Sequence, residues 1–196
     1  MGLREQKRQL TREAIADAAL ALALDVGLEY VTVEAIAAAV LISPRTVSNY
    51  FSCKEEAVVA GGLSDSYRIV DDFAGRPAEE SPLHSVRAVL VEIARGRSAE
   101  QQRVALQKIE LVRSYPLLAS FVAAQYARLE ERLRGAIAAR KGADLGADVS
   151  PWLTAAAAVS AIRYAEASWV DSGGRPEDMP ELLQRAFEQV EGALSQ

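Results

Sequence analysis

Three polar side chains, Arg45, Ser48 and Asn49, stand at spacings that bring them together on one face of a helix. Arginine can form a forked pair of hydrogen bonds with guanine, asparagine can do so with adenine, and serine can bond to either kind of base edge. Each good paired contact discriminates between bases by roughly 1–3 kcal/mol. The pattern therefore predicts a surface that reads base edges in duplex DNA, with Pro44 beside it for an apolar contact.

Two short helices joined by a tight turn are expected to position this surface. The first begins after Thr32, whose hydroxyl can accept a hydrogen bond from a free amide at the helix start. Its apolar side chains recur at helical spacing and would share a buried face: Val33, Ile36, Ala37 and Val40. The second helix runs from Ser43-Pro44, a typical helix start, to about Phe51. Val47 and Phe51 would point inward, which leaves the polar face in solvent.

A third helix is expected to follow directly, from Cys53 to about Phe73. Ser52 and Glu55 have the spacing of a capping box, which would start this helix. Lys54 then falls in the first turn, where the helix dipole disfavours a cation. We therefore expect its ammonium group to bind an external anion such as a DNA phosphate.

The spacing alone does not establish DNA binding, because short amphipathic helices followed by a capped helix occur in many other helical proteins. The exposed polar face and the basic N-terminus favour a DNA-binding helix-turn-helix. Four basic residues, Arg4, Lys7, Arg8 and Arg12, stand among the first twelve, although the whole chain has a net charge of −5. This stretch could be a solvated, disordered tail or an arm that follows the DNA backbone or enters a minor groove.

The same segment resembles the DNA-binding domain of TetR-family transcriptional regulators. An alanine- and leucine-rich helix ends at Gly27, Thr32 begins the motif T-V-x-x-I-A, and Ser43 begins S-x-x-T-V-x-x-Y-F-x-x-K-E. The resemblance implies an all-α dimeric regulator, usually a repressor, in which a small molecule binds the C-terminal domain and releases the protein from a palindromic operator. Leu41 departs from the pattern, because such proteins usually have glycine in this turn. A turn that requires positive φ would strain leucine by about 1 kcal/mol.

These observations assign roles to eight side chains. We expect Arg45, Ser48 and Asn49 to read bases with Pro44 alongside, and four further side chains to bind phosphates: Thr32, Thr46, Tyr50 and Lys54. The chain is expected to comprise a helix-turn-helix domain at residues 1–55 and a helical ligand-binding and dimerisation domain at 56–196.

Composition limits the remaining possibilities. The N-terminus imitates a signal peptide, but Asp17 interrupts the apolar stretch. The longest uncharged runs have 14 residues, fewer than the roughly 20 needed to cross a bilayer. Cys53 is the only cysteine, which excludes an internal disulfide and suits a reducing cytoplasm. We expect a soluble cytoplasmic protein without a membrane partner, whose acidic total charge is compatible with DNA binding through a local basic surface.

Helical signals continue to the end of the chain, and no strand pattern is present, so we expect an all-α fold of about nine helices. Later helices are predicted from Ser81-Pro82 and from Ser98, then from Pro116 to about Arg140, from Ser150-Pro151 to about Val170, and over 180–194. The stretch 154–170 is small-sided nearly all round and needs cover on more than one face. We expect the last two helices to form a homodimer as a four-helix bundle, the alternative being a buried helix in a monomer.

The ligand-binding residues are more weakly indicated. Aromatic and polar side chains of the later helices could line and anchor an apolar cavity: Gln107, Glu110, Tyr115, Phe121, Tyr126, Trp152, Arg163 and Trp169. The aromatic residues could equally pack in the core, and Arg163 could pair with Glu166 three positions later.

Catalysis is not indicated. His84 is the only histidine, and neither a second histidine nor a cysteine partner is available to form a metal site or a nucleophile pair with it. No phosphate-binding loop motif occurs, and we expect no cofactor and no metal. The alternative to a DNA-binding regulator is a helical ligand-binding or protein-interaction dimer without operator-specific DNA binding. Salt-dependent binding to duplex DNA would separate the two.

Overall fold

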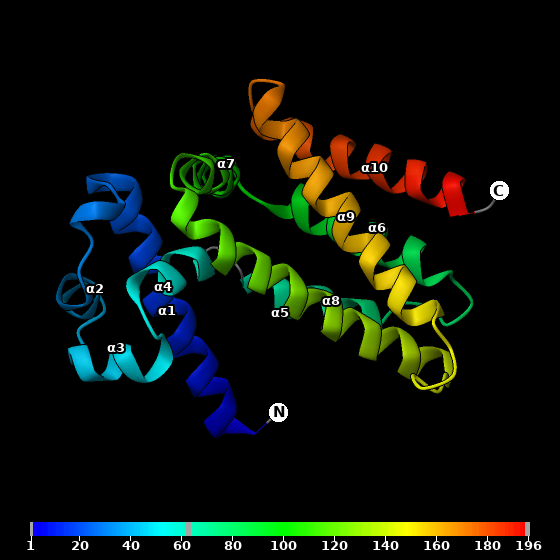
Figure 1. The fold of residues 1–196 in the computed structure, drawn as a ribbon, viewed down its shortest axis with the longest axis horizontal. Helices are drawn as coiled ribbons and strands as arrows, with labels where there is room; N and C mark the ends of the chain where they lie inside the picture. The colour runs from blue at the N-terminus through cyan, green and yellow to red at the C-terminus, as the bar shows by residue number, and fades with distance from the viewer. Residues whose placement is uncertain (1, 62–63, 195–196) are drawn as a thin grey trace. The chain divides into compact units, whose positions relative to one another are not determined.

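The computed structural model describes residues 2–61 and 64–194, and the polypeptide there forms ten α-helices and three 3₁₀ helices with no strand (Figure 1). The predicted all-α class is confirmed, with one helix more than the nine or so expected. Contacts divide the chain into two compact units: unit 1 contains Met1–Ser64 and Gln107–Ala123, and unit 2 contains Asp65–Leu106 and Ala124–Gln196. Helices α7 (Ala99–Ser114) and α8 (Ala119–Lys141) each contribute residues to both units.

Unit 1 is built around α1 (Leu3–Val26). The other elements of its N-terminal part are η1 (Leu28–Tyr30), α2 (Val33–Ala39), α3 (Pro44–Tyr50) and α4 (Lys54–Ala60), and η2 (Pro116–Leu118) joins α7 to α8. Ile15 of α1, Ile36 of α2 and Val59 of α4 are fully buried. Helices α2 and α4 both pack against α1, and α3 packs on α2.

The basic N-terminus forms the first turns of α1, so the predicted disordered tail was wrong, and the alternative of an arm that contacts DNA stays a prediction. Arginine, lysine, glutamine and leucine are good helix formers, and this stretch extends a helix that is already anchored by its buried C-terminal half. Arg4, Lys7 and Arg8 lie on one exposed face. Arg12 instead turns inward, with its guanidinium 4.1 Å from the centre of the Phe51 ring and 3.9 Å from Glu56.

The single helix predicted over residues 53–73 is also wrong, because α4 ends at Ala60 and α5 (Ser64–Ala74) is separate. Gly61 adopts an extended conformation with ψ 144° and so stops the helix. A Cβ atom on Gly61 would lie 2.5 Å from Cβ of Leu20 and 2.6 Å from the carbonyl oxygen of Ala16. Only glycine lets the chain pass this close to α1. The apolar periodicity of the sequence continues through this point and does not reveal the break.

Unit 2 contains α5, α6 (Pro82–Gly96), α9 (Ser150–Asp171), η3 (Pro176–Asp178), α10 (Met179–Leu194) and parts of α7 and α8. Helix α10 lies alongside α9 and also packs on α6 (Figure 1). Phe187 and Trp169 are fully buried, and the indole of Trp169 donates a hydrogen bond to the Arg175 carbonyl at 2.7 Å. None of the described helices is both long and apolar enough to span a membrane.

A network of charged and polar groups joins α5, α6 and α8 within unit 2. Ser85, which is fully buried, donates to Glu80 at 2.9 Å and accepts from Arg140 at 2.8 Å. Arg140 also donates to the Phe73 carbonyl and stacks 3.7 Å above the Phe73 ring. Two hydrogen bonds from Arg76, at 2.8 and 2.6 Å, hold the pKa of Glu80 down at about 2.

Leu41 makes the turn between α2 and α3, and it is the one residue other than glycine in the described chain that has a positive φ, at 56°. The amide of Leu41 donates to Ala38 at 3.3 Å and that of Ile42 to Ala37 at 3.0 Å. This pair of bonds is a Schellman motif, in which glycine is the preferred residue at the left-handed position. The side chain is 93% exposed, so it gains little from burial in return for the strain.

Replacing Leu41 with glycine should therefore stabilise the protein by about 1 kcal/mol and raise its melting temperature by about 2–4 °C. Thermal unfolding followed by circular dichroism measures the effect. Val40→Gly is the matched control, because Val40 has a φ of −106° and glycine there should lower the melting temperature. A lower melting temperature for Leu41→Gly would contradict the strain argument.

Glu80 should make stability depend on pH in acid. Its pKa is lowered from 4.5 in the free side chain to about 2 by the bonds from Arg76, so its stabilising effect is complete above about pH 4.5 and is lost as the pH falls toward 2. The free energy of unfolding of Glu80→Gln should consequently fall less steeply over this range than that of the wild type. Denaturant titrations at several pH values measure it, with the exposed neighbour Glu79→Gln as control. Parallel pH profiles for Glu80→Gln and wild type would refute the assignment.

Candidate DNA-binding surface

The helix-turn-helix begins and ends as its capping residues dictate. The Thr32 hydroxyl accepts a hydrogen bond from the Ala35 amide at 3.1 Å, and the Ser43 hydroxyl accepts one from the Thr46 amide at 3.1 Å. Pro44 occupies the first position of α3, where no amide hydrogen is needed. Both helix starts lie where the sequence predicts them.

Helix α3 has one buried and one exposed face. Val47 and Phe51 are only 2% and 4% exposed and fix the helix against the core of unit 1. The side chains predicted to meet bases are all exposed on the other side: Pro44, Arg45, Ser48 and Asn49. Ser48 donates to the carbonyl of Pro44 at 3.2 Å, a local bond that it can exchange for an external acceptor. The structure thus supplies the common face, and contact with bases stays a prediction.

The residues predicted to bind phosphates surround this face unevenly. Thr32 is exposed and caps α2, and Tyr50 is half-buried at the end of α3. The Thr46 hydroxyl shares a 2.8 Å hydrogen bond with that of Ser43. Their phosphate contacts stay predictions.

The predicted capping box of Ser52 and Glu55 is wrong by one position. The amide and the hydroxyl of Ser52 both donate to the Glu56 carboxylate, at 2.9 and 2.8 Å, and Cys53 rather than Ser52 precedes the first residue of α4. Because α4 starts one residue later than expected, it is Glu56 that reaches back across the first turn.

Lys54, the first residue of α4, directs its ammonium group at the protein itself. The Nζ atom donates to the carbonyl oxygens of Leu28 at 2.9 Å and Val31 at 2.8 Å, and a third carbonyl, that of Glu29, lies at 3.4 Å. Its predicted phosphate contact is not tested by these distances, but the internal acceptors were not foreseen. Leu28 and Glu29 belong to η1, a short 3₁₀ helix that the sequence pattern did not indicate, and Val31 directly follows it.

The predicted ligand-binding residues fall into different parts of the fold. Gln107, Glu110, Tyr115 and Phe121 belong to unit 1, where Tyr115 donates to the Glu29 carboxylate at 2.6 Å. Trp152 is half exposed on α9, whereas Trp169 is a core residue with its indole bonded to the backbone.

Three groups in unit 2 do come together. The Tyr126 hydroxyl on α8 donates to the Glu166 carboxylate on α9, and the Arg163 guanidinium lies 5.5 Å from the centre of the Tyr126 ring. Burial, followed by the negative charge of Glu166, raises the pKa of Tyr126 far above its usual value. Arg163 and Glu166 of α9 therefore both contact Tyr126 of α8, a partner that spacing along one helix could not predict.

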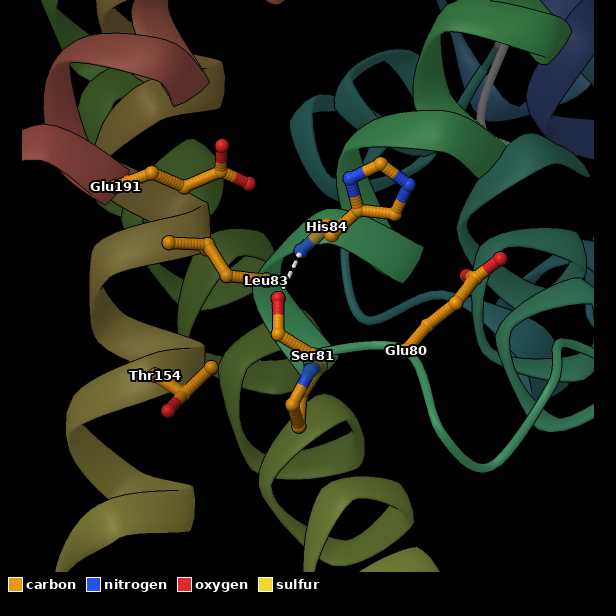
Figure 2. Close-up of a pocket in the computed structure, with 7 residues that line it drawn as sticks. Glu80, Ser81, Leu83, His84, Thr154 and Glu191 are labelled. Carbon is orange, nitrogen blue, oxygen red and sulfur yellow. Dashed lines mark hydrogen bonds between the residues drawn. The ribbon is translucent and has the colours of Figure 1, made fainter.

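A separate cavity in unit 2 has a volume of about 570 Å³ and is lined by residues that sequence reasoning did not select for ligand binding (Figure 2). It lies where the start of α6 meets Thr154 of α9 and Glu191 of α10. Figure 2 shows the Ser81 hydroxyl accepting from the His84 amide, at 3.3 Å, as the cap of α6. The His84 ring is 2.7 Å from Arg87, which in turn donates to Glu191 at 3.0 Å. Among the described residues, no cluster of three or more His, Cys, Asp or Glu side chains could hold a metal ion.

Two short capped helices, of which the second (α3) exposes a polar face, are the arrangement of helix-turn-helix DNA-binding proteins. In this chain they are accompanied by unit 2, which is also helical. Comparison with known proteins narrows the class. Residues 15–60 match the family described as bacterial regulatory proteins, tetR family, and residues 80–195 match the family described as MftR C-terminal domain.

Individual relatives agree with these matches. The HTH-type transcriptional regulator TcmR of Streptomyces glaucescens is 32% identical over 173 residues, covering 86% of this chain and 76% of TcmR. Similar folds occur in SmeT, the repressor of the Stenotrophomonas maltophilia efflux pump SmeDEF, with a TM-score of 0.59 and 19% identity over 93% of this chain and 89% of SmeT. Thermus thermophilus FadR, solved with lauroyl-CoA, has a TM-score of 0.56 and 22% identity over 91% and 92% of the two chains.

The chain belongs to the TetR family of bacterial transcriptional regulators. Its function is therefore DNA-binding transcriptional regulation, and its family consists of transcription factors rather than enzymes, as the sequence predicts.

Proposed function

We propose that this protein is a dimeric repressor that binds a palindromic operator through α3 and leaves it when a small molecule binds. The observation that carries the proposal is the exposed face of Arg45, Ser48 and Asn49 on a helix whose opposite side is buried. A short helix fixed in this way can enter a major groove with its polar side chains toward the base edges.

Contacts to the DNA backbone would fix the position of α3 along the groove. Thr32 and Thr46 lie at the starts of the two helices and Tyr50 at the end of the second, which suits them to phosphates on either side of one groove. The exposed Arg4, Lys7 and Arg8 extend the basic surface along the first turns of α1. Such residues add affinity without sequence preference.

A second copy of the chain would cover the exposed face of α9. Leu153 and Tyr164 are 51% and 63% exposed, and small residues share their helix face at helical spacing: Ala156, Ser160 and Ala167. Apolar and small side chains on one stripe allow another helix to approach closely. A dimer would also supply two α3 helices, and two such helices about 34 Å apart can read successive major grooves of a palindrome.

A hydrophobic or amphipathic molecule is the effector that we propose for unit 2. SmeT has been solved with triclosan and Thermus thermophilus FadR with lauroyl-CoA, whose lauroyl chain is apolar and whose coenzyme A part is charged. Tyr126, Arg163 and Glu166 would provide the polar anchors here. A coupling of about 1–3 kcal/mol between effector and operator is enough to change occupancy many-fold. Such a regulator would work in the cytoplasm, where its DNA is.

Selection of bound duplexes from a random DNA pool tests the proposal. Wild-type protein should enrich a palindrome, and Arg45→Ala should lose preference at one base position in each half-site, at a cost of about 1–3 kcal/mol. Arg128→Ala, which changes an exposed arginine of α8, should enrich the wild-type motif. If wild-type protein enriches no sequence, the alternative of a helical ligand-binding or interaction dimer without operator binding would be favoured.

The dimer can be tested separately by sedimentation. Because Tyr164 is exposed in one chain, Tyr164→Arg should leave the protomer folded but place a charge in the proposed interface. We expect a shift from dimer to monomer at micromolar concentration, together with weaker binding to the palindrome. Leu117→Arg is a matched control, since Leu117 is 54% exposed in unit 1 and outside α9. A dimeric Tyr164→Arg protein would place the interface elsewhere.

A further inference from the structure

The Lys54 ammonium group connects the segment that follows the helix-turn-helix to the segment that precedes it. Lys54 follows α3 directly, whereas the carbonyl groups of Leu28 and Val31, at 2.9 and 2.8 Å from Nζ, precede α2. The α2–α3 pair is thus enclosed between two segments that one side chain holds together. With the carbonyl of Glu29 at 3.4 Å, three acceptors face the three N–H donors of the ammonium group.

This arrangement gives the cation at the start of α4 an internal partner. The carbonyl groups around a short helix carry partial negative charge and have lone pairs to spare, and that of Leu28 also accepts from the Val31 amide at 3.3 Å. The ammonium group of Lys54 donates further hydrogen bonds to the carbonyls of Leu28 and Val31. In this conformation its donors are directed at the backbone of unit 1 and away from an external phosphate.

The same turn is held from a distant part of the chain. Tyr115, which lies between α7 and η2, donates to the carboxylate of Glu29 at 2.6 Å. This bond is the main reason that the pKa of Glu29 lies below its usual value, and the charge of Lys54 lowers it further. Glu29 therefore takes part twice, through its carboxylate with Tyr115 and through its backbone with Lys54.

A second hydrogen bond attaches α7 to the N-terminal part of unit 1. Lys108 of α7 donates to the carbonyl of Gly61 at 2.6 Å, directly after α4. Leu118 of η2 is fully buried. The segment 107–123 is consequently built into unit 1, although α7 and α8 both continue along the chain into unit 2.

We propose that Tyr115, Glu29 and Lys54 form a positioning relay that sets the orientation of the α2–α3 pair for operator binding, with Lys54 acting through backbone carbonyls and not on a phosphate. The proposal rests on the function proposed for the α3 face. None of the three residues touches DNA in this scheme. The relay makes operator affinity depend on the placement of the α7–α8 junction, where Tyr115 lies.

The salt dependence of operator binding distinguishes positioning from phosphate contact at Lys54. Lys54→Met should weaken binding to the duplex selected by wild-type protein roughly tenfold, at every salt concentration alike. Loss of a phosphate contact would instead lower the slope of log affinity against log salt by about one. Fluorescence anisotropy over a range of salt concentrations measures both. A reduced slope for Lys54→Met would overturn the proposal.

A double-mutant cycle tests the connection to Tyr115. Tyr115→Phe removes only the hydroxyl and should weaken operator binding in the wild-type background, but have little further effect in Lys54→Met. Tyr30→Phe is the matched control, because Tyr30 is 71% exposed, next to Glu29, and should bind the operator as the wild type does. Additive effects of Tyr115→Phe and Lys54→Met, or an equal loss in Tyr30→Phe, would refute the relay.

Hydrogen exchange of the free protein provides a readout that needs no DNA. Amides at the start of α2 should lose protection in Tyr115→Phe but keep it in Tyr30→Phe. This comparison does not depend on whether Lys54→Met folds, and it separates the two proposals. If the wild type binds no operator but Tyr115→Phe lowers the protection of the α2 amides, the proposed function is refuted. The structural role of the hydrogen bond from Tyr115 to Glu29 is then still supported. Unchanged protection in Tyr115→Phe would overturn the relay itself.

Discussion

Burial of one side of α3 is the constraint on which the DNA-binding surface depends. A helix of seven residues has too few internal hydrogen bonds to persist alone in water, so its packing decides both that it forms and which way it faces. Val47 and Phe51 provide that packing, and Arg12 covers the Phe51 ring from α1. Because these apolar contacts orient the helix, Arg45 and Asn49 need no contacts of their own to lie together on its exposed face.

The segments around the α2–α3 pair are held by polar contacts of another kind. Lys54 binds the backbone before α2, and Tyr115 binds the same turn through Glu29. Polar bonds of partly exposed groups each contribute modestly to stability, and they can therefore be made and broken at little cost. An apolar core with such polar attachments would suit the positioning role proposed for Tyr115, Glu29 and Lys54.

Unit 2 combines a well-filled core with features that a single protomer does not use. Trp169 and Phe187 are fully buried, and the Arg140 network joins three helices. Helix α9 nevertheless leaves Leu153 and Tyr164 half exposed, which is the reason for proposing a second copy. The cavity at the start of α6 is polar on several sides, with Arg87 compensating the carboxylate of Glu191.

Local chemistry in the sequence by itself determined the all-α class, the capped starts at Thr32 and Ser43, the shared face of α3 and the strained turn at Leu41. Each depends on residues within one or two helical turns, where spacing and side-chain type suffice. Tertiary structure alone decided the partners of Lys54 and the break at Gly61. Both are set by residues that are distant along the chain, on η1 and α1, and no local pattern encodes which carbonyl or helix will lie within 3 Å.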